Sequence, residues 1–245
     1  FFQSEEEIEN EIATALIPHL ETNVLDAVYF YGAGCVPDKV PMMHNALSTH
    51  LNTKNGIEVN TDMLAVARGL CGHKPGIACI MGTGSNSCFY DGEKIASNVS
   101  PLGFILGDEG SGAVLGKLLV GDMLKNQMTP ELKEKFLNKT GLTPPEIIDR
   151  VYRQPFPNRF LASLSPFLAE NIQEPSVHAL VLGSFKAFFQ RNVMQYDYKN
   201  HPVHFIGSVA YHYQDILHEA ARELEIQITT IVKSPMQGLM TFHQS

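Results

Sequence analysis

The stretch Ile77-Ala78-Cys79-Ile80-Met81-Gly82-Thr83-Gly84-Ser85-Asn86 is an apolar run that breaks directly into glycines, hydroxyls and a carboxamide. A short apolar run bounded by a glycine turn is typical of a buried β-strand. Glycine has no Cβ, so backbone N–H groups beside it can approach an anion closely. We therefore predict a phosphate-binding turn after a buried strand. A plain tight turn is the alternative interpretation.

Strand patterns alternate with helical patterns on both sides of this stretch, which predicts an α/β fold. A change of pattern near residues 72–76 marks the expected domain boundary. The expected strands are 27–31, 57–59, 77–81, 87–90, 94–95, 203–206 and 226–232; the expected helices are 4–20, 37–51, 62–70, several pieces between 111 and 196, one from Ser208 through Glu223, and one opened by Ser234-Pro235.

Composition narrows the class of partner. The chain has 245 residues, a formal net charge of -8 and 18 scattered basic residues, so we expect a small-molecule partner and no nucleic acid or anionic membrane. It has no apolar run long enough to span a bilayer and no basic leader, which favours a soluble cytoplasmic protein. Its four cysteines form no C-x-x-C pair and its histidines show no metal-binding spacing, so we expect reduced thiols and no disulfide, zinc or iron–sulfur cluster.

Three further positions are candidates for chemistry. Asp62 lies where the strand 57–59 gives way to a helix, so it either caps that helix or accepts a proton from a substrate hydroxyl. Asp108 and Glu109 lie in the glycine-rich run 107–112 and would suit sugar hydroxyls or a hydrated Mg²⁺, or simply the dipole of the next helix. Gly207-Ser208 follows a strand and could pass under a nucleotide, although taken alone it is explained better by a plain strand-to-helix connection.

Taken in order, these motifs resemble the N-acetylglucosamine kinase branch of the BadF/BadG/BcrA/BcrD ATPase family, in the actin–hexokinase–Hsp70 superfamily. The resemblance implies two ribonuclease-H-like lobes. They would comprise an incomplete N-terminal lobe at 1–73 and a C-terminal lobe at 74–245 with a helical insertion at about 111–196. It also implies transfer of a phosphoryl group from ATP, with Mg²⁺, to the 6-hydroxyl of an amino sugar, most simply N-acetylglucosamine, by a homodimer.

The resemblance assigns roles residue by residue. Asp62 matches the general base on the sugar hydroxyl. The residues expected to bind the nucleotide are Gly82, Thr83, Gly84, Gly207 and Ser208. Those expected to bind or shape the sugar site are Asp62, Ser85, Asn86, Gly103, Gly107 and Asp108, and no residue is expected to bind a metal directly.

Two departures from the family pattern leave alternatives open. Leu102 stands where the human-type kinase has a tryptophan, which affects the grip on the N-acetyl group. The Asp-Gly-Gly/Ser-Thr phosphate hairpin of the superfamily does not precede the helix at Ser4, so we expect this chain to be impaired as a kinase. The alternatives are an ATPase that activates a dehydratase through an iron–sulfur cluster, which the scattered cysteines disfavour, and a sugar-binding regulator without chemistry.

Overall fold

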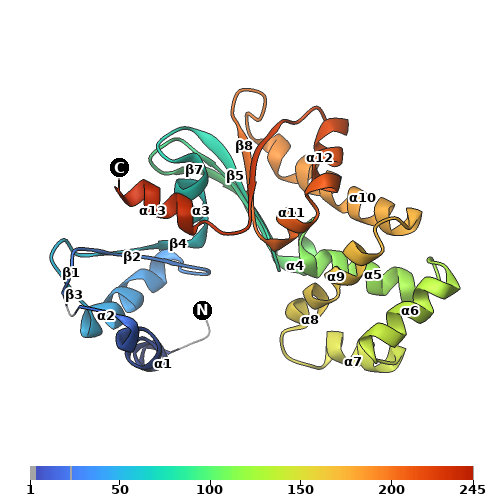
Figure 1. Cartoon of the computed structure of the whole chain (residues 1–245), viewed down its shortest axis with the longest axis horizontal. Coiled ribbons are helices and arrows are strands. Elements are labelled where there is room, and N and C mark those ends of the chain that lie inside the picture. Colours follow the sequence, from blue (N-terminus) through green and yellow to red (C-terminus); the bar gives the residue numbers. More distant parts are fainter. Residues whose placement is uncertain (1–3, 23, 245) are drawn as a thin grey trace. The chain divides into compact units, whose positions relative to one another are not determined.

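The computed structural model describes residues 4–22 and 24–244, which form two compact units (Figure 1). The first unit extends to Ala65 and the second begins at Val66. The division therefore falls inside helix α3 (Asp62–Cys71), before the boundary expected at 73/74. The assignment of the two ribonuclease-H-like lobes to 1–73 and 74–245 remains a proposal.

The first unit begins with a capped helix. The Ser4 hydroxyl accepts a hydrogen bond from the Glu7 amide, and the Glu7 carboxylate accepts one from the Ser4 amide. These two bonds satisfy free N–H groups at the start of α1 (Glu5–Glu11), within the helix expected at 4–20. The helical path continues through a π-helical turn and a 3₁₀ turn that ends at His19, so the expected helix is present with altered geometry in its second half.

Two pairs of parallel strands complete the first unit. β2 (Val28–Gly32) pairs with β4 (Ile57–Thr61), and β1 (Val24–Leu25) pairs with β3 (Asn52–Thr53). α2 (Val40–His50) connects them, and its buried Met43 and Leu47 join a small apolar core with residues of α1 and with Val59. The strands expected near 27–31 and 57–59 are confirmed, whereas β1 and β3 are too short to leave a pattern.

The second unit is built on one five-stranded sheet with the strand order β7-β6-β5-β8-β9. β5, β6 and β7 form an antiparallel meander, and β8 and β9 run parallel to β5. All five strands are expected from the sequence, with ends that shift by a few residues. Their bounds are β5 (Gly76–Met81), β6 (Ser85–Tyr90), β7 (Ile95–Val99), β8 (Val203–Ile206) and β9 (Ile228–Val232).

Helices make up most of the rest of the second unit. Several of them begin at a proline, whose fixed φ and missing N–H suit the first helical turn. The single expected helix after Ser208 is divided in two at Tyr213. The helices are α4 (Gly103–Leu106), α5 (Gly112–Leu124), α6 (Pro130–Thr140), α7 (Pro144–Tyr152), α8 (Pro157–Ser163), α9 (Ser165–Glu170), α10 (Pro175–Arg191), α11 (Ser208–His212), α12 (Gln214–Glu223) and α13 (Met236–Gln244).

Both faces of the five-stranded sheet are covered (Figure 1). On one face, Ile77 and Cys79 pack into a large core with the fully buried Phe185 of α10. On the other face, α13 crosses the second half of α3 so closely that a Cβ on Gly238 would lie 1.9 Å from the Gly69 carbonyl oxygen. Burial on both faces explains why β5 reads as a continuous apolar run and why β8 is apolar except for the buried His204.

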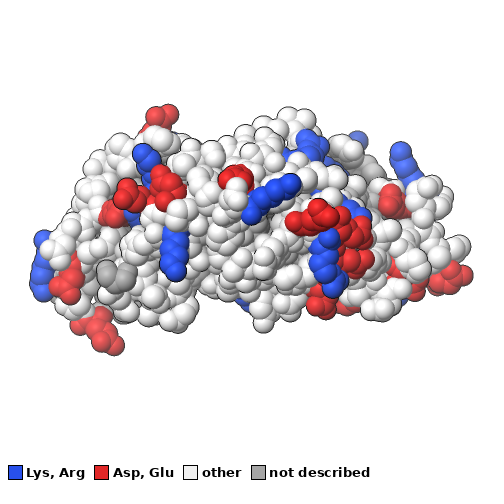
Figure 2. Space-filling view, turned by 90° about the horizontal axis from the view of Figure 1, so that it is seen from above, with Lys and Arg blue, Asp and Glu red and all other residues white. Residues whose placement is uncertain are grey.

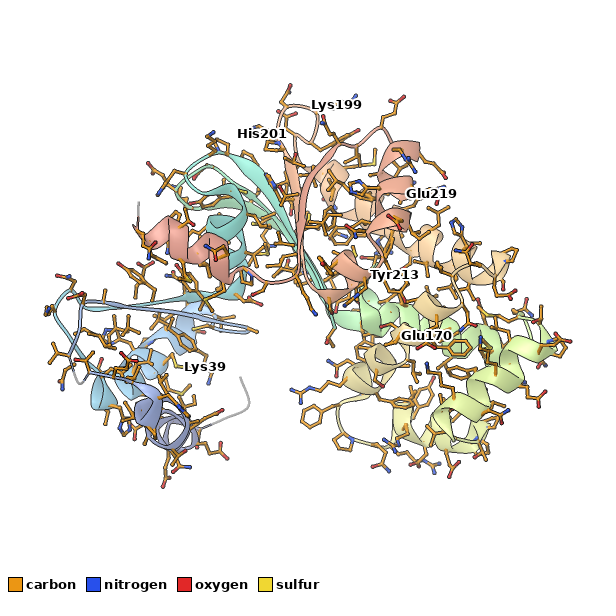
Figure 3. The ribbon with its side chains drawn as sticks, in the orientation of Figure 1. Lys39, Glu170, Lys199, His201, Tyr213 and Glu219 are labelled. Carbon is orange, nitrogen blue, oxygen red and sulfur yellow. The ribbon has the colours of Figure 1, made fainter. Side chains whose placement is uncertain are left out.

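Side-chain contacts also fix the helices to one another. Tyr213, labelled in Figure 3, lies between α11 and α12 and donates a hydrogen bond to the Ser165 carbonyl at the start of α9. Glu219 of α12, also labelled there, lies 3.0 Å from the His178 Nε2 of α10. Acidic and basic side chains are interspersed on the face drawn in Figure 2. Among the described residues, none of the helices is both long and apolar enough to cross a membrane.

Candidate functional site

The turn between β5 and β6 contains Gly82, Thr83 and Gly84, and its glycines do not serve to permit positive φ. The Gly82 amide donates to the Gly84 carbonyl at 2.9 Å and closes the turn. A Cβ on Gly84 would lie 2.9 Å from Oδ2 of Asp108, whereas a Cβ on Gly82 would meet nothing within 4 Å. The close contact with Asp108 therefore explains why a glycine occupies position 84. The open space beside Gly82 is what the approach of a ligand requires.

The N-terminus of α5 holds this turn by its carbonyl groups. The Gly112 amide donates to the Gly82 carbonyl at 2.8 Å, and the Ala113 amide donates to the Thr83 carbonyl at 3.1 Å. The first amides of α5 are therefore occupied by the turn and are not open to an anion. The amides of Thr83 and Gly84 have no backbone acceptor within the part of the chain that the structure describes. They are the donors that this turn can offer to a phosphate.

The start of α5 is itself fixed by a buried cap. Ser111 is fully buried, and its hydroxyl accepts a hydrogen bond from the Val114 amide at 3.2 Å. Its carbonyl accepts from the Leu115 amide at 2.8 Å. With the two amides that bind the turn, every N–H group of the first turn of α5 has a partner. The glycine-rich run 107–112 thus leads into a helix N-terminus whose amides hold the β5–β6 turn in place.

Asp108 lies directly against the β5–β6 turn. Its backbone has a φ of 55°, in the left-handed region, and its carboxylate accepts a hydrogen bond from the Ser85 amide. Burial raises the pKa of the Asp108 carboxyl to about 6, and the negative charge of Glu109 adds to this effect, whereas the Ser85 amide and the Lys117 ammonium group oppose it. An ionised carboxylate at this place can accept hydrogen bonds from substrate hydroxyls.

Glu109 points away from Asp108 and has a structural role. Its side chain is only 14% exposed and forms an ion pair with Nε of Arg191 at 2.9 Å. Its carbonyl accepts a hydrogen bond from the Ser85 hydroxyl at 2.8 Å. The two neighbouring carboxylates therefore do not form one joint site. In the described residues, moreover, no three His, Cys, Asp or Glu side chains are placed to hold a metal ion.

The polar residues after the turn are partly used within the fold. Ser85 is buried, and its hydroxyl binds the Glu109 carbonyl. Oδ1 of Asn86 accepts from the Ser87 amide at 2.8 Å and from Nδ2 of Asn98 at 2.9 Å. A ligand would therefore meet the amide nitrogen of Asn86 and not its oxygen. Sequence reasoning missed Asn98, because its link to Asn86 depends on the pairing of β6 with β7.

Gly207 brings the end of β8 against the end of β5. Its φ of 121° is accessible to glycine alone, and a Cβ would lie 2.3 Å from the Met81 carbonyl oxygen. The Gly207 amide donates to the Val232 carbonyl at 3.1 Å, and the exposed Ser208 begins α11. The turn expected to bind adenosine thus lies next to the β5–β6 turn. Its contact with a nucleotide remains a prediction.

Gly103 and Gly107 belong to the loop that leads into Asp108. Gly103 has a φ of 74°, and a Cβ on Gly107 would lie 2.2 Å from the Pro101 carbonyl oxygen. The backbone conformation at Gly103 and the close contact at Gly107 therefore explain why both positions are glycine. Leu102, the residue before Gly103, is 58% exposed and itself has a φ of 60°.

Asp62 belongs to the first unit and is the first residue of α3. Its Oδ1 accepts a hydrogen bond from the Met63 amide at 2.9 Å, and the Thr61 hydroxyl accepts one from the Leu64 amide at 3.2 Å. Thr61 thus caps the start of α3. Burial raises the pKa of the Asp62 carboxyl despite the bond from Met63, which makes the carboxylate a better proton acceptor.

Neither a family model nor a curated protein matches the chain. Among solved structures, it is similar to a putative N-acetylglucosamine kinase from Porphyromonas gingivalis, with 50% identity, a TM-score of 0.95, and coverage of 98% of this chain and 86% of that one. The fold also matches a putative N-acetylglucosamine kinase from Chromobacterium violaceum (19% identity, TM-score 0.74, coverage 98% and 87%). A further match is the ROK hexokinase from Thermus thermophilus (12% identity, TM-score 0.52, coverage 99% and 87%).

These matches and the geometry of the glycine turns define an α/β protein with the actin-like ATPase and sugar-kinase fold. At 50% identity over most of both chains, the chain belongs to the family of N-acetylglucosamine kinase-like proteins in the actin–hexokinase–Hsp70 superfamily. The expected fold class and the expected relationship to these kinases are confirmed. The roles of the individual site residues remain predictions.

Proposed function

We propose that this protein transfers a phosphoryl group from ATP to the 6-hydroxyl of an amino sugar, with N-acetylglucosamine as the first candidate. The observation that carries the proposal is the position of Asp108 against the β5–β6 turn. Within one unit, a carboxylate suited to sugar hydroxyls lies beside backbone amides suited to a phosphate. Family membership supports the same reaction class.

The proposal gives each candidate residue a role. The amides of Thr83 and Gly84 bind phosphate oxygens, the turn at Gly207 and Ser208 contacts the nucleoside, and Asp108 orients the sugar. Asp62 accepts the proton of the attacking hydroxyl, a task for which the raised pKa of its carboxyl is suited. Mg²⁺ would enter with the nucleotide and neutralise phosphate charge. A cytoplasmic homodimer belongs to the same proposal.

The positions of the cysteines do not support the alternative function, an ATPase that activates a dehydratase through an iron–sulfur cluster. Cys79 lies on the core face of the sheet, and Cys88, which pairs with Ala78 across the strands, lies on the opposite face. Both are fully buried, and burial raises the pKa of the Cys88 thiol to about 12. A cluster ligand must be an accessible thiolate, so these residues do not suit that chemistry.

A sugar panel tests the proposal directly. The protein is incubated with Mg-ATP and N-acetylglucosamine, glucosamine, N-acetylmannosamine or glucose, ADP release is followed, and the product is located by NMR. We expect one amino sugar to be phosphorylated at its 6-hydroxyl. Calorimetry with sugar and with a non-hydrolysable ATP analogue separates the alternatives. Sugar binding without nucleotide binding would favour the regulator, and binding of neither ligand would overturn the proposal.

Replacement of Asp62 by asparagine tests its assigned role. If Asp62 is the general base, kcat falls by roughly 10²- to 10⁴-fold while sugar affinity changes little. Asp26→Asn is the matched control, because Asp26 lies in the same unit and forms a surface ion pair with Lys54. Full activity of the Asp62→Asn variant would exclude the assigned role.

A further inference from the structure

The loop that carries Asp108 is held in an unfavourable backbone conformation. Leu102, Gly103 and Asp108 all have positive φ, and two of them are not glycine. Such residues persist only where surrounding contacts hold them. Within the loop, the Gly107 amide donates to the Gly103 carbonyl at 2.7 Å, and the Asp108 amide donates to the Pro101 carbonyl at 3.1 Å.

One further contact comes from outside the loop. Nζ of Lys117, on α5, donates a hydrogen bond to the Phe104 carbonyl at 2.6 Å. Phe104 belongs to the single helical turn α4, whose last carbonyls have no partner within so short a helix. A cation at the C-terminal end of a helix is favoured both as a donor and by the helix dipole. Lys117 therefore stabilises α4 through the Phe104 carbonyl.

The loop needs this contact because little else covers it. Ile105 and Leu106 are 73% and 68% exposed, so the outer face of α4 contributes almost no burial. The Phe104 side chain is partly buried against the core of the second unit. Phe104 is thus fixed twice, by its ring in the core and by its carbonyl on Lys117.

We propose that Lys117 is a positioning residue, which holds residues 101–107 and thereby keeps Asp108 in the conformation that binds the sugar. The proposal rests on the proposed function for its reference to sugar but on the structure for its mechanism. Lys117 does not need to touch a substrate. It acts through Phe104 and through the charge that it places near Asp108.

The positive charge of Lys117 also favours sugar binding, because it helps to keep the Asp108 carboxyl ionised. Of the groups that act on the Asp108 carboxyl, burial and the Glu109 charge raise its pKa, while the Ser85 amide and the Lys117 ammonium group lower it. Glu109 is itself paired with Arg191, so its effect does not depend on Lys117. Loss of Lys117 is therefore expected to raise the pKa of Asp108 above about 6 and to reduce the ionised fraction near neutral pH.

The test compares Lys117→Met with Lys117→Arg, which retains a cationic donor, and with the control Lys133→Met. Lys133 is also half-buried and donates a single hydrogen bond, at 2.7 Å to Oδ1 of Asn126, far along the chain from Asp108. Two readouts are taken on the full chain: hydrogen exchange of the peptide that covers residues 101–110, and the pH profile of kcat/KM for the sugar.

For Lys117→Met we expect exchange of this peptide to accelerate at least about tenfold, KM for the sugar to rise roughly tenfold, and the acidic limb of the profile to move to higher pH. Lys117→Arg should keep the exchange rate, the KM and the pH profile close to those of wild type, and Lys133→Met should change none of them. Unchanged exchange and an unchanged profile in Lys117→Met would overturn the proposal, as would an arginine variant as defective as the methionine variant. If wild-type protein phosphorylates no sugar, the proposed function fails, and hydrogen exchange still tests the positioning role.

Discussion

Replacement of Gly207 by alanine is expected to destabilise the second unit by about 3 kcal/mol or more. The φ of 121° alone costs a side chain about 1–3 kcal/mol. The new Cβ would also lie 2.3 Å from the Met81 carbonyl oxygen, so the backbone must shift, and overpacking of this kind costs a further 1–3 kcal/mol. Because Met81 leads directly into Gly82, the shift should also disturb the β5–β6 turn.

The matched control is Gly183→Ala. Gly183 lies within α10, and a Cβ there would meet nothing within 4 Å, so alanine should stabilise the helix by about 0.5–1 kcal/mol. Urea unfolding is followed by circular dichroism, because the chain has no tryptophan. A loss of about 3 kcal/mol lowers the midpoint by about 1 M or more. A Gly207→Ala midpoint within about 0.3 M of wild type would refute the geometric reasoning.

Two further substitutions test the site. The pKa of the Asp108 carboxyl is raised from 3.8 to about 6 in the folded protein, so its contribution to stability is present below about pH 3.8 and is lost as the pH rises through about 6. Asp108→Asn should therefore lose less stability than wild type between about pH 4 and pH 8. The same variant should bind sugar more weakly. Thermal melts across this range check the prediction, and identical pH dependence of the two proteins would contradict it. Ser111→Ala should cost about 1 kcal/mol and raise KM for ATP, whereas Thr129→Ala, which removes the cap of α6, should cost a similar amount without changing KM. Equal KM values in both variants would show that the α5 cap does not support the turn.

Much of the fold could be predicted from local patterns. The runs at 77–81 and 203–206 coincide with β5 and β8 to within one residue, because burial on both faces makes such strands largely apolar, with His204 as the exception in β8. The capping box at Ser4 and the prolines that open α6, α7 and α10 fix helix ends by short-range chemistry. The single turn α4 escaped prediction, because a contact with Lys117 stabilises it and its own sequence does not.

The sequence could indicate which residues form the candidate site, but not the contacts among them. The glycine turns mark where backbone must approach closely, and the structure places them together. The sequence treats Asp108 and Glu109 as equivalent neighbours, whereas the positive φ of Asp108 sends their side chains to different partners. The partners of Glu109 and Asn86 lie on other elements, so no local spacing could reveal them.

The contact between α5 and the β5–β6 turn has an electrostatic consequence. The Gly82 carbonyl and the Thr83 amide belong to one peptide group, and the Thr83 carbonyl and the Gly84 amide belong to the next. The carbonyl end of each group accepts a hydrogen bond from the N-terminus of α5. A peptide group polarised at its oxygen becomes a stronger donor at its nitrogen. The partial positive charge of the helix end is thus relayed through two peptide dipoles to the amides of Thr83 and Gly84, so the helix dipole acts one peptide layer beyond the helix itself.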